Sequence, residues 1–555
     1  MYKPTLSKNA AISTIIAVVM GLFLNILLGF NVKAALGETL PPVPAGLKSH
    51  FALGLSSQPG ATGWMKESGA AWDIRYQYLA GGVNTPGNWK TWQDPALPAG
   101  QFALDYLNES YETGYLPVLT WYQILQSSPA IGADEAGKDY SNLNNPGTMN
   151  SYFADFKLLM DKAKIFGKTV IVHIEPDLWG FLQKQSTNPA NLTAAVASSG
   201  NSDLINYSDT VSGFARALIG LRDKYAPNVL LAYHISPWSS SYGDLGTNTD
   251  PDFNVEGAYK ETGAFYNQLN ANFDLLFYDI ADRDAALYSS WGSPNHWWDV
   301  NNQVYPNFNR FNQFAAGITS VTGKRGMLWQ VPIGNTLFES LNNTHQHWQD
   351  NRVQYYLGGG TNQHLQDLAN SGIMGILFGA GDNNSTSYND AAADGITNPA
   401  PFNGNSRVSE FSDDDGGYLR LQAREYYNRG TVTLQVVETA PAATVPAGPV
   451  NTVPSAAWQL VSTLNSASNS QTIVSQFNAP SNASGSYILD IEVYDVATGT
   501  KIAQWHPTQA LTPGQILTLE NHLQLAPGSY IVKQGVFNPD WSLISWQDGP
   551  TFQVN

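Results

Sequence analysis

The sequence contains no cysteine and has few charged residues for its length. Over 555 residues, Asp, Glu, Lys and Arg together account for 13%, whereas about 25% is usual in soluble proteins. Without cysteine the chain has no disulfide, no thiolate nucleophile and no Cys-ligated zinc site. The 28 basic residues against 45 acidic ones give a formal net charge of -17. This balance argues against a nucleic-acid backbone or an anionic membrane surface as the partner.

Several motifs of cofactor and metal chemistry are also missing. No Gly-x-Gly-x-x-Gly opens a first strand-to-helix turn, which argues against a doubly wound dinucleotide-binding sheet, and no Gly-x-Ser-x-Gly is present. His345 and His347 are two residues apart and would point away from each other on a helix. The acidic run 413–415 lacks the spacing of a calcium loop and reads as a solvated turn. The sequence therefore predicts no cofactor and no metal site.

Aromatic residues are abundant instead. They make up 12% of the chain, with 16 Trp and 27 Tyr. Flat, partly polar rings of this kind stack on the C–H faces of sugars. A polysaccharide or oligosaccharide is therefore the expected partner, and the oligomeric state stays open.

The chain reads as four consecutive segments. Residues 1–35 carry Lys3 and Lys8, an apolar run and a small-residue cleavage pattern, which is typical of an export signal. An uncleaved anchor is the alternative, because about 20 apolar residues can cross a bilayer. We expect a catalytic domain over 36–438, a Pro/Ala/Thr linker over 439–455 and an all-β domain over 456–555. The protein is then secreted, or held at the cell surface if the signal stays.

Apolar runs of strand length alternate with amphipathic helical patterns in the second segment. Helices are predicted, for example, over 149–166 and 348–370. Eight strands joined by helices favour an α/β fold in which a parallel sheet closes into a (β/α)8 TIM barrel. Short alternating strands after residue 458 favour a small β-sandwich, and 431–437 is one further possible strand. The eight barrel strands are expected at 51–55, 72–79, 116–122, 169–175, 229–235, 275–280, 327–331 and 373–378.

In such barrels the functional side chains lie at the carboxyl ends of the strands. This rule converts the strand assignment into a set of predicted substrate-binding residues: Arg75, Tyr76, Trp121, Tyr122, His173, His234, Trp238, Tyr278, Trp329, Gln330 and Asp382.

The end of the fourth strand carries three ionisable side chains at alternating positions, His173, Glu175 and Asp177. Alternation places them on one face of the strand, where burial tunes their pKa values. We interpret Glu175 as the principal catalytic acid or base; a hydrogen-bonded or salt-bridged strand end is the alternative. Glycosidic bond cleavage needs a second carboxyl group across the sugar. Asp279 at the end of the sixth strand is the predicted partner.

Two further acids follow Asp279, at Asp282 and Asp284. Both are secondary catalytic candidates, together with Asp177. The competing interpretation is that Asp282, Arg283 and Asp284 form a self-contained ion-pair turn.

These features together resemble a secreted bacterial glycoside hydrolase with a (β/α)8 barrel and a linked sandwich. In the clan of cellulases and mannanases, a Glu-Pro pair at this position follows an Asn and supplies the acid/base, which corresponds to Glu175. Here Ile174 replaces that Asn, and Gln330 stands where the clan has its nucleophilic Glu. The resemblance implies a β-glycan substrate such as cellulose or hemicellulose. Gln330 keeps open a non-catalytic carbohydrate-binding barrel of the cell surface, and an anchored protein that remodels its own envelope is a third possibility.

A more local resemblance concerns the acidic motifs. The stretches 278–286 and 174–177 are similar to two signatures of glycoside hydrolase family six, the inverting cellobiohydrolases and endoglucanases, although they occur here in the opposite order. The likeness implies that Asp177 is the general acid and Asp284 its helper. Trp541 and Trp546 near the C-terminus resemble a sugar-stacking pair of an accessory domain, or they are core residues of it.

Overall fold

The computed structural model describes residues 40–337, 348–379, 385–388 and 415–435, and then 458–467, 470–480, 483, 485–513, 515–523, 525–538 and 542–554. The chain divides into two compact units, Met1–Thr439 and Ala440–Asn555. The predicted signal and linker lie outside the described residues. Across these described ranges, none of the helices combines the length and hydropathy that crossing a membrane requires.

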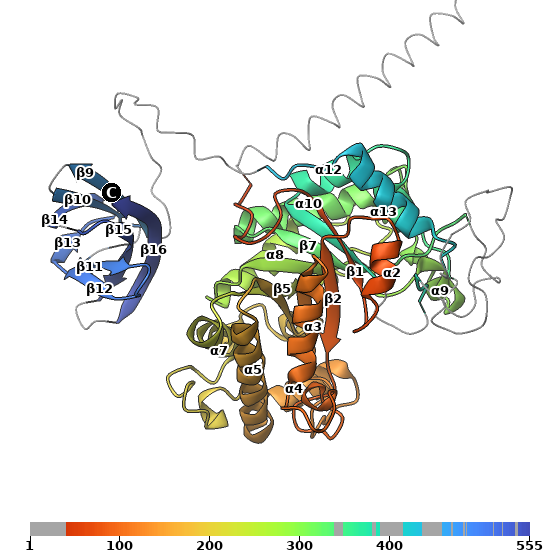
Figure 1. The fold of residues 1–555 in the computed structure, drawn as a ribbon, viewed down its shortest axis with the longest axis horizontal. Helices are drawn as coiled ribbons and strands as arrows, with labels where there is room; N and C mark the ends of the chain where they lie inside the picture. The colour runs from red at the N-terminus through yellow and green to blue at the C-terminus, as the bar shows by residue number, and fades with distance from the viewer. Residues whose placement is uncertain are drawn as a thin grey trace, which may run out of the picture. The chain divides into compact units, whose positions relative to one another are not determined.

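The first unit is a closed barrel of eight parallel strands in sequence order (Figure 1). This confirms the predicted TIM barrel, and each strand ends within two residues of its expected position. The strands are β1 (Ala52–Ser56), β2 (Ile74–Leu79), β3 (Leu116–Trp121), β4 (Val170–Ile174), β5 (Val229–Ile235), β6 (Leu275–Asp279), β7 (Gly326–Val331) and β8 (Ile373–Phe378).

The outer helices form where an amphipathic sequence is flanked by residues that cap the two helix ends. In α5 (Pro146–Phe166), the side chain of Asn145 accepts from the backbone N–H of Thr148, Pro146 occupies the first turn, and Gly167 closes the helix at φ 68°. The other helices are α2 (Thr62–Glu67), α3 (Gln101–Glu112), α4 (Glu135–Leu143), α6 (Leu178–Gln185), α7 (Val211–Tyr225), α8 (Val255–Gln268), α9 (Ala285–Ser290), α10 (Phe308–Thr322), α11 (Arg352–Leu357), α12 (Gln363–Asn370) and α13 (Tyr418–Arg429).

Two secondary-structure predictions for this unit need correction. The helix expected over 348–370 is interrupted, because Gly359 and Gly360 take φ of 75° and 73° between α11 and α12. In the stretch 431–437, residues 431–435 contain no strand in the described structure, and Thr433 makes only an isolated bridge to His50.

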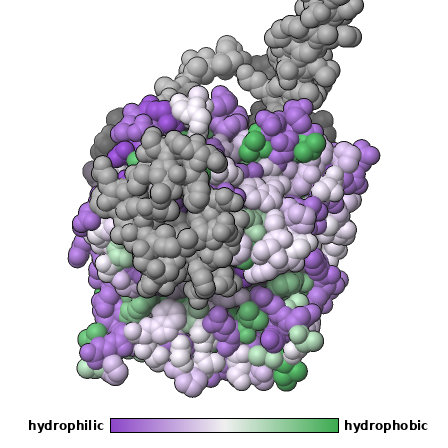
Figure 2. Space-filling model, turned by 90° about the vertical axis from the view of Figure 1, so that its right-hand side faces the viewer, coloured by the Kyte–Doolittle hydropathy of each residue, from purple (hydrophilic) through white to green (hydrophobic). Residues whose placement is uncertain are grey.

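Side chains inside the barrel alternate with side chains that face the helices. Phe277 and Trp329 pack against His173 within the barrel, each with ring centroids 4.6 Å from the imidazole. Tyr278, which follows Phe277, instead packs outward against Phe311 in the helix layer, and most strand residues are buried on either face. On the face of this unit drawn in Figure 2, apolar residues form small separate groups among hydrophilic ones.

The second unit is an antiparallel β domain with its own hydrophobic cluster. One sheet has the order β14-β10-β9, and the other has β12-β11-β15-β16 with β13 paired to β11. Phe477 from the first sheet and Leu489 and Val536 from the second belong to one buried cluster. The bounds are β9 (Gln459–Ala467), β10 (Ser470–Asn478), β11 (Gly485–Asp495), β12 (Lys501–Trp505), β13 (Thr508–Leu511), β14 (Ile516–Leu523), β15 (Gly528–Phe537) and β16 (Leu543–Val554).

Candidate active site

A cavity of about 410 Å³ opens beside the carboxyl ends of β4, β5 and β6. This volume is within the range of small-molecule sites, which is about 300 to 1,000 Å³. Its lining combines carboxylates with aromatic rings. The lining includes Asp177, Asp279, Asp282, Phe181, Trp238 and Trp298.

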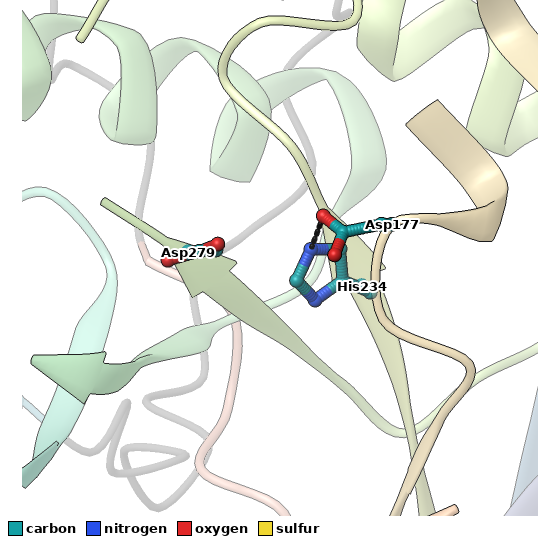
Figure 3. Close-up of side chains that lie close together, drawn as sticks. All are labelled: Asp177, His234 and Asp279. Carbon is teal, nitrogen blue, oxygen red and sulfur yellow. Dashed lines mark ion pairs between the residues drawn. The ribbon is translucent and has the colours of Figure 1, made fainter. Parts of the chain in front are cut away.

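Three side chains converge beside this cavity, which two of them, Asp177 and Asp279, line (Figure 3). Asp177 follows β4 and adopts a φ of 66°, His234 belongs to β5, and Asp279 is the last residue of β6. One donor atom from each lies within 4.8 Å of the other two. The closest approach of His234 to Asp177 joins Nε2 to Oδ1 at 3.8 Å. Three successive strands of the barrel thus bring two carboxyl groups and an imidazole together.

Both carboxyl groups hold their protons more tightly than usual. Burial, followed by the charges of Glu135 and Asp282, raises the pKa of Asp177 to about 7. Burial also raises the pKa of Asp279 well above its ordinary value, and Asp282 and Asp177 raise it further. Because neighbouring carboxylates resist double ionisation, the pair retains one proton near neutral pH. One acid and one carboxylate therefore coexist at the cavity.

His234 is a neutral imidazole supported by a second histidine. Burial lowers the pKa of His234 to about 3 and that of His173 well below its ordinary value. Nε2 of His173 lies 3.0 Å from Nδ1 of His234, and Nδ1 of His173 lies 3.5 Å from Oγ1 of Thr120. His173 is fully buried, so it lies beneath the cavity and orients His234.

Gln330 contacts Asp279 without lining the cavity itself. Its Nε2 donates to Oδ2 of Asp279 at 3.5 Å, and its Oε1 accepts from the hydroxyl of Tyr78 at 2.7 Å. Gln330 adopts a φ of 45°, and the pairing of β7 with β8 changes register between Leu328 and Val331. This irregularity lets Gln330 reach the carboxyl ends of the strands although the preceding Trp329 already faces the barrel interior.

Glu175 does not occupy its predicted position. Its side chain is 1% exposed and is absent from the cavity lining. The carboxyl oxygens accept from the backbone N–H groups of Gln123 and Ile124 at 3.1 to 3.2 Å. Strand alternation ends at Ile174, and Glu175 itself adopts a φ of 42°, which turns its side chain toward the segment after β3. The expectation that Glu175 faces Asp279 across the mouth is therefore wrong.

Asp284 also does not line the cavity. It is fully buried, and its carboxyl group accepts from the backbone N–H groups of Gly334 at 3.0 Å and Thr386 at 2.7 Å. Asp282 does line the cavity, where Arg283 and the hydroxyl of Tyr288 bind its carboxylate. The ion-pair interpretation of this turn thus applies to Asp282 and Arg283. Asp284 instead links the segments around Gly334 and Thr386 through hydrogen bonds.

Three predicted substrate-binding residues point outward from the barrel and need correction. Arg75 pairs with Glu109 of α3 at 2.7 Å, Trp121 packs edge-on against Phe156 of α5, and Tyr278 packs against Phe311 of α10. Each lies one position away from a residue that faces the barrel interior, so the alternation of the strand directs it into the helix layer.

The remaining predicted residues divide between the mouth, the interior and other places. Tyr122 donates to Glu135 at 3.0 Å, and its ring lies against Tyr78. Tyr76 and Trp329 are buried inside the barrel beneath the mouth, with ring centroids 6.5 Å apart. Trp546 is 40% exposed on β16, and its indole donates to Asp548 at 3.1 Å. Asp382, Trp541, His345 and His347 lie outside the described residues.

Some cavity residues were missed because they lie beyond the strand ends. Tyr288 belongs to α9 and stacks on His296 with ring centroids 3.5 Å apart, whereas His296 and Trp298 follow that helix. Phe181 and Lys184 come from α6. The aromatic run 296–298 was the available signal for this loop, whereas nothing in the sequence marks the helical residues.

Comparison with known proteins adds little to this geometry. No protein-family model and no curated protein sequence matches the chain. Among solved structures, the chain is similar to a modular endo-β-1,4-mannanase of glycoside hydrolase family 26 from Cellulomonas fimi. The identity is 12%, the match covers 93% of this chain and 99% of the mannanase, and the TM-score is 0.39.

A second similar structure is a family 18 chitinase from Pseudoalteromonas aurantia. Its identity is 11%, the match covers 59% of this chain and 93% of the chitinase, and the TM-score is 0.33. Both proteins are named as glycoside hydrolases. The assignment of the barrel here rests on the strand order itself and not on these similarities.

Proposed function

We propose that the protein is a glycoside hydrolase that cleaves a polysaccharide with Asp177 and Asp279 as its two catalytic carboxyl groups. The observation that carries this proposal is their convergence on one cavity, with oxygen atoms within 4.8 Å of each other. Hydrolysis of a glycosidic bond needs one protonated and one ionised carboxyl group on the two sides of the bond. A pair that retains one proton near neutral pH meets this requirement.

The two groups receive different roles. Burial, followed by the charges of Asp282 and Asp177, favours the protonated form of Asp279 more strongly than that of Asp177, so we assign Asp279 as the general acid. Asp177 ionises more readily and is the nucleophile. Retaining enzymes place their carboxyl groups about 5 to 5.5 Å apart, whereas inverting enzymes leave about 6.5 to 9.5 Å for a water molecule. The short separation here therefore favours retention of the anomeric configuration.

The aromatic lining supports a sugar polymer as the substrate. Phe181 and Trp238 lie with ring centroids 4.9 Å apart on one side of the cavity, and Trp298 and Tyr288 also line it. Rings of this kind offer apolar faces to sugars and polar edges to their hydroxyl groups. A β-glycan such as cellulose or hemicellulose remains the proposed substrate, on the basis of the motif resemblance.

Release of reducing ends from a polysaccharide panel tests the proposal. Asp177→Asn and Asp279→Asn should each lose about 10²- to 10⁴-fold in rate, the usual contribution of an acid or base. Asp244→Asn is the matched control, because Asp244 lines the same cavity but binds its own turn through Gly246 and Thr247. Binding of glycans without release by the wild type would instead favour the non-catalytic carbohydrate-binding protein.

We also propose that the protein acts outside the cell and that its C-terminal unit is a β-sandwich that holds the polymer. The signal-like segment 1–35 supports the first statement, and the single hydrophobic cluster shared by the two sheets supports the second. N-terminal mass spectrometry of the exported protein tests the cleavage. Sedimentation of the full chain with insoluble glycan, with and without Trp546→Ala, tests the holding role.

A further inference from the structure

We propose that Asp177, His234 and Asp279 form a binding site for a divalent transition-metal ion. The sequence predicts no metal site, because these residues are separated by 57 and 45 positions and share no ligand motif. The barrel brings them together from the ends of three successive strands. One donor atom from each lies within 4.8 Å of the other two, so small side-chain rotations suffice to enclose one ion.

A second observation points to a ligand at this position. His234 is 1% exposed, yet its Nε2 has no hydrogen-bond partner among the described residues and points at the carboxylate of Asp177. Oδ1 of Asp279 is likewise buried without a hydrogen-bond partner there. Buried polar atoms are almost always satisfied, because leaving one unpaired costs about 1 to 3 kcal/mol. A single cation between the three side chains would satisfy both atoms.

The surroundings of His234 also suit a ligand. A ligating imidazole must offer a lone pair on Nε2, so its proton must reside on Nδ1. In that tautomer Nδ1 donates to Nε2 of His173 at 3.0 Å, and Nδ1 of His173 carries the proton that faces Oγ1 of Thr120 at 3.5 Å. Metal-binding histidines are commonly oriented by such a partner on the second ring nitrogen. Gln330 orients Asp279 in the same way through Oδ2.

The donor set determines the class of ion. One imidazole nitrogen and two carboxylate oxygens suit zinc, manganese or cobalt, whereas calcium and magnesium prefer oxygen ligands alone. Three protein ligands leave at least one coordination position open, unlike the four protein ligands of structural zinc sites. We therefore assign the site to a first-row transition-metal ion and use zinc as the probe.

The proposed metal site shares both carboxyl groups with the proposed hydrolase. A bound ion would withhold Asp177 and Asp279 from a sugar, so zinc should inhibit hydrolysis in competition with the substrate. This consequence rests on the proposed function, whereas the binding of the ion does not. Measuring the two separately distinguishes failure of one proposal from failure of the other.

Isothermal titration of zinc chloride into metal-free full-length protein is the test. The wild type should bind one ion per chain at this site. Asp177→Asn, His234→Gln and Asp279→Asn should each weaken binding by at least about 10-fold, because loss even of a residue that only orients a ligand costs about 10- to 100-fold. Asp244→Asn and His296→Ala are the matched controls, since both residues line the same cavity outside the cluster.

Three results would overturn the assignment: no zinc binding by the wild type, unchanged binding in the three cluster variants, or equal loss in the controls. Calcium that binds as tightly as zinc would overturn the class of ion. Circular dichroism establishes that each variant is folded, and the two Asp→Asn variants decide the outcome if His234→Gln unfolds. Zinc binding without any hydrolase activity would refute only the proposed function.

Discussion

Glu175→Gln is the sharpest test of how the acidic groups divide between structure and chemistry. The Glu175 side chain is 1% exposed and accepts backbone N–H groups from Gln123 and Ile124. Burial raises its pKa from 4.5 to about 8 despite these hydrogen bonds. In the folded protein Glu175 is therefore protonated at neutral pH, whereas in the unfolded chain it is ionised.

This difference makes stability depend on pH in a defined window. Between pH 4.5 and about 8 the folded state binds the extra proton, so the free energy of unfolding falls as the pH rises. Each pKa unit corresponds to about 1.4 kcal/mol. The contribution of Glu175 is thus small near pH 4.5 and reaches a loss of about 5 kcal/mol above pH 8, as an upper limit.

Glutamine imitates the protonated carboxyl group and removes this dependence. Urea unfolding of wild type and Glu175→Gln should give similar free energies at pH 5, and the variant should be more stable at pH 8 by up to about 4 kcal/mol. Hydrolysis by the folded variant should fall by less than about 10-fold, since removal of a catalytic acid costs about 10²- to 10⁴-fold. A stability difference that is the same at both pH values, or a catalytic loss of the larger size, would refute the reasoning.

Four further outcomes are expected. Because Asp177 must be ionised and has a pKa of about 7, kcat/KM should rise with pH through that value; a fall through pH 7 would exchange the roles of Asp177 and Asp279. Proton NMR of the first product should show retained anomeric configuration, and an inverted product would contradict the double displacement through Asp177 that we propose. Trp238→Ala should raise KM more than it lowers kcat, and an unchanged KM would remove Trp238 from the substrate site. Arg75→Ala should lower the urea-measured stability by about 1 to 3 kcal/mol and leave KM unchanged, because Arg75 is buried against Glu109 and α3.

The barrel could be predicted from the sequence because its strands and helices differ in period and are separated by clear end signals. The direction in which each strand side chain points could not be predicted in the same way. Strands of a parallel barrel are buried on both faces, so their sequences are apolar throughout and do not reveal which alternate residues face inward. Arg75, Trp121 and Tyr278 were placed at the mouth for this reason, although they face α3, α5 and α10.

The site could be predicted only in part, since several of its residues come from outside the strands. The strand-end rule predicts that Asp177, His234, Asp279 and Gln330 lie near one another, because each is in the last two residues of a strand or shortly beyond it. Trp298 belongs to a loop beyond α9, and Phe181 belongs to α6, so no strand-end rule reaches them. Their approach to the cavity depends on the packing of complete βα units.

The different positions of Glu175 and Asp177 have a common physical cause. Glu175, Asp177 and Gln330 are non-glycine residues with φ of 42°, 66° and 45°, and all three lie just after or within the ends of β4 and β7. Such conformations cost on the order of 1 to 3 kcal/mol each and persist only where the surroundings fix them. Here the hydrogen bonds of Glu175 to Gln123 and Ile124 anchor the turn that aims Asp177 at the cavity. Strand alternation predicts a catalytic role for Glu175, but in the structure its side chain instead stabilises the turn that carries Asp177.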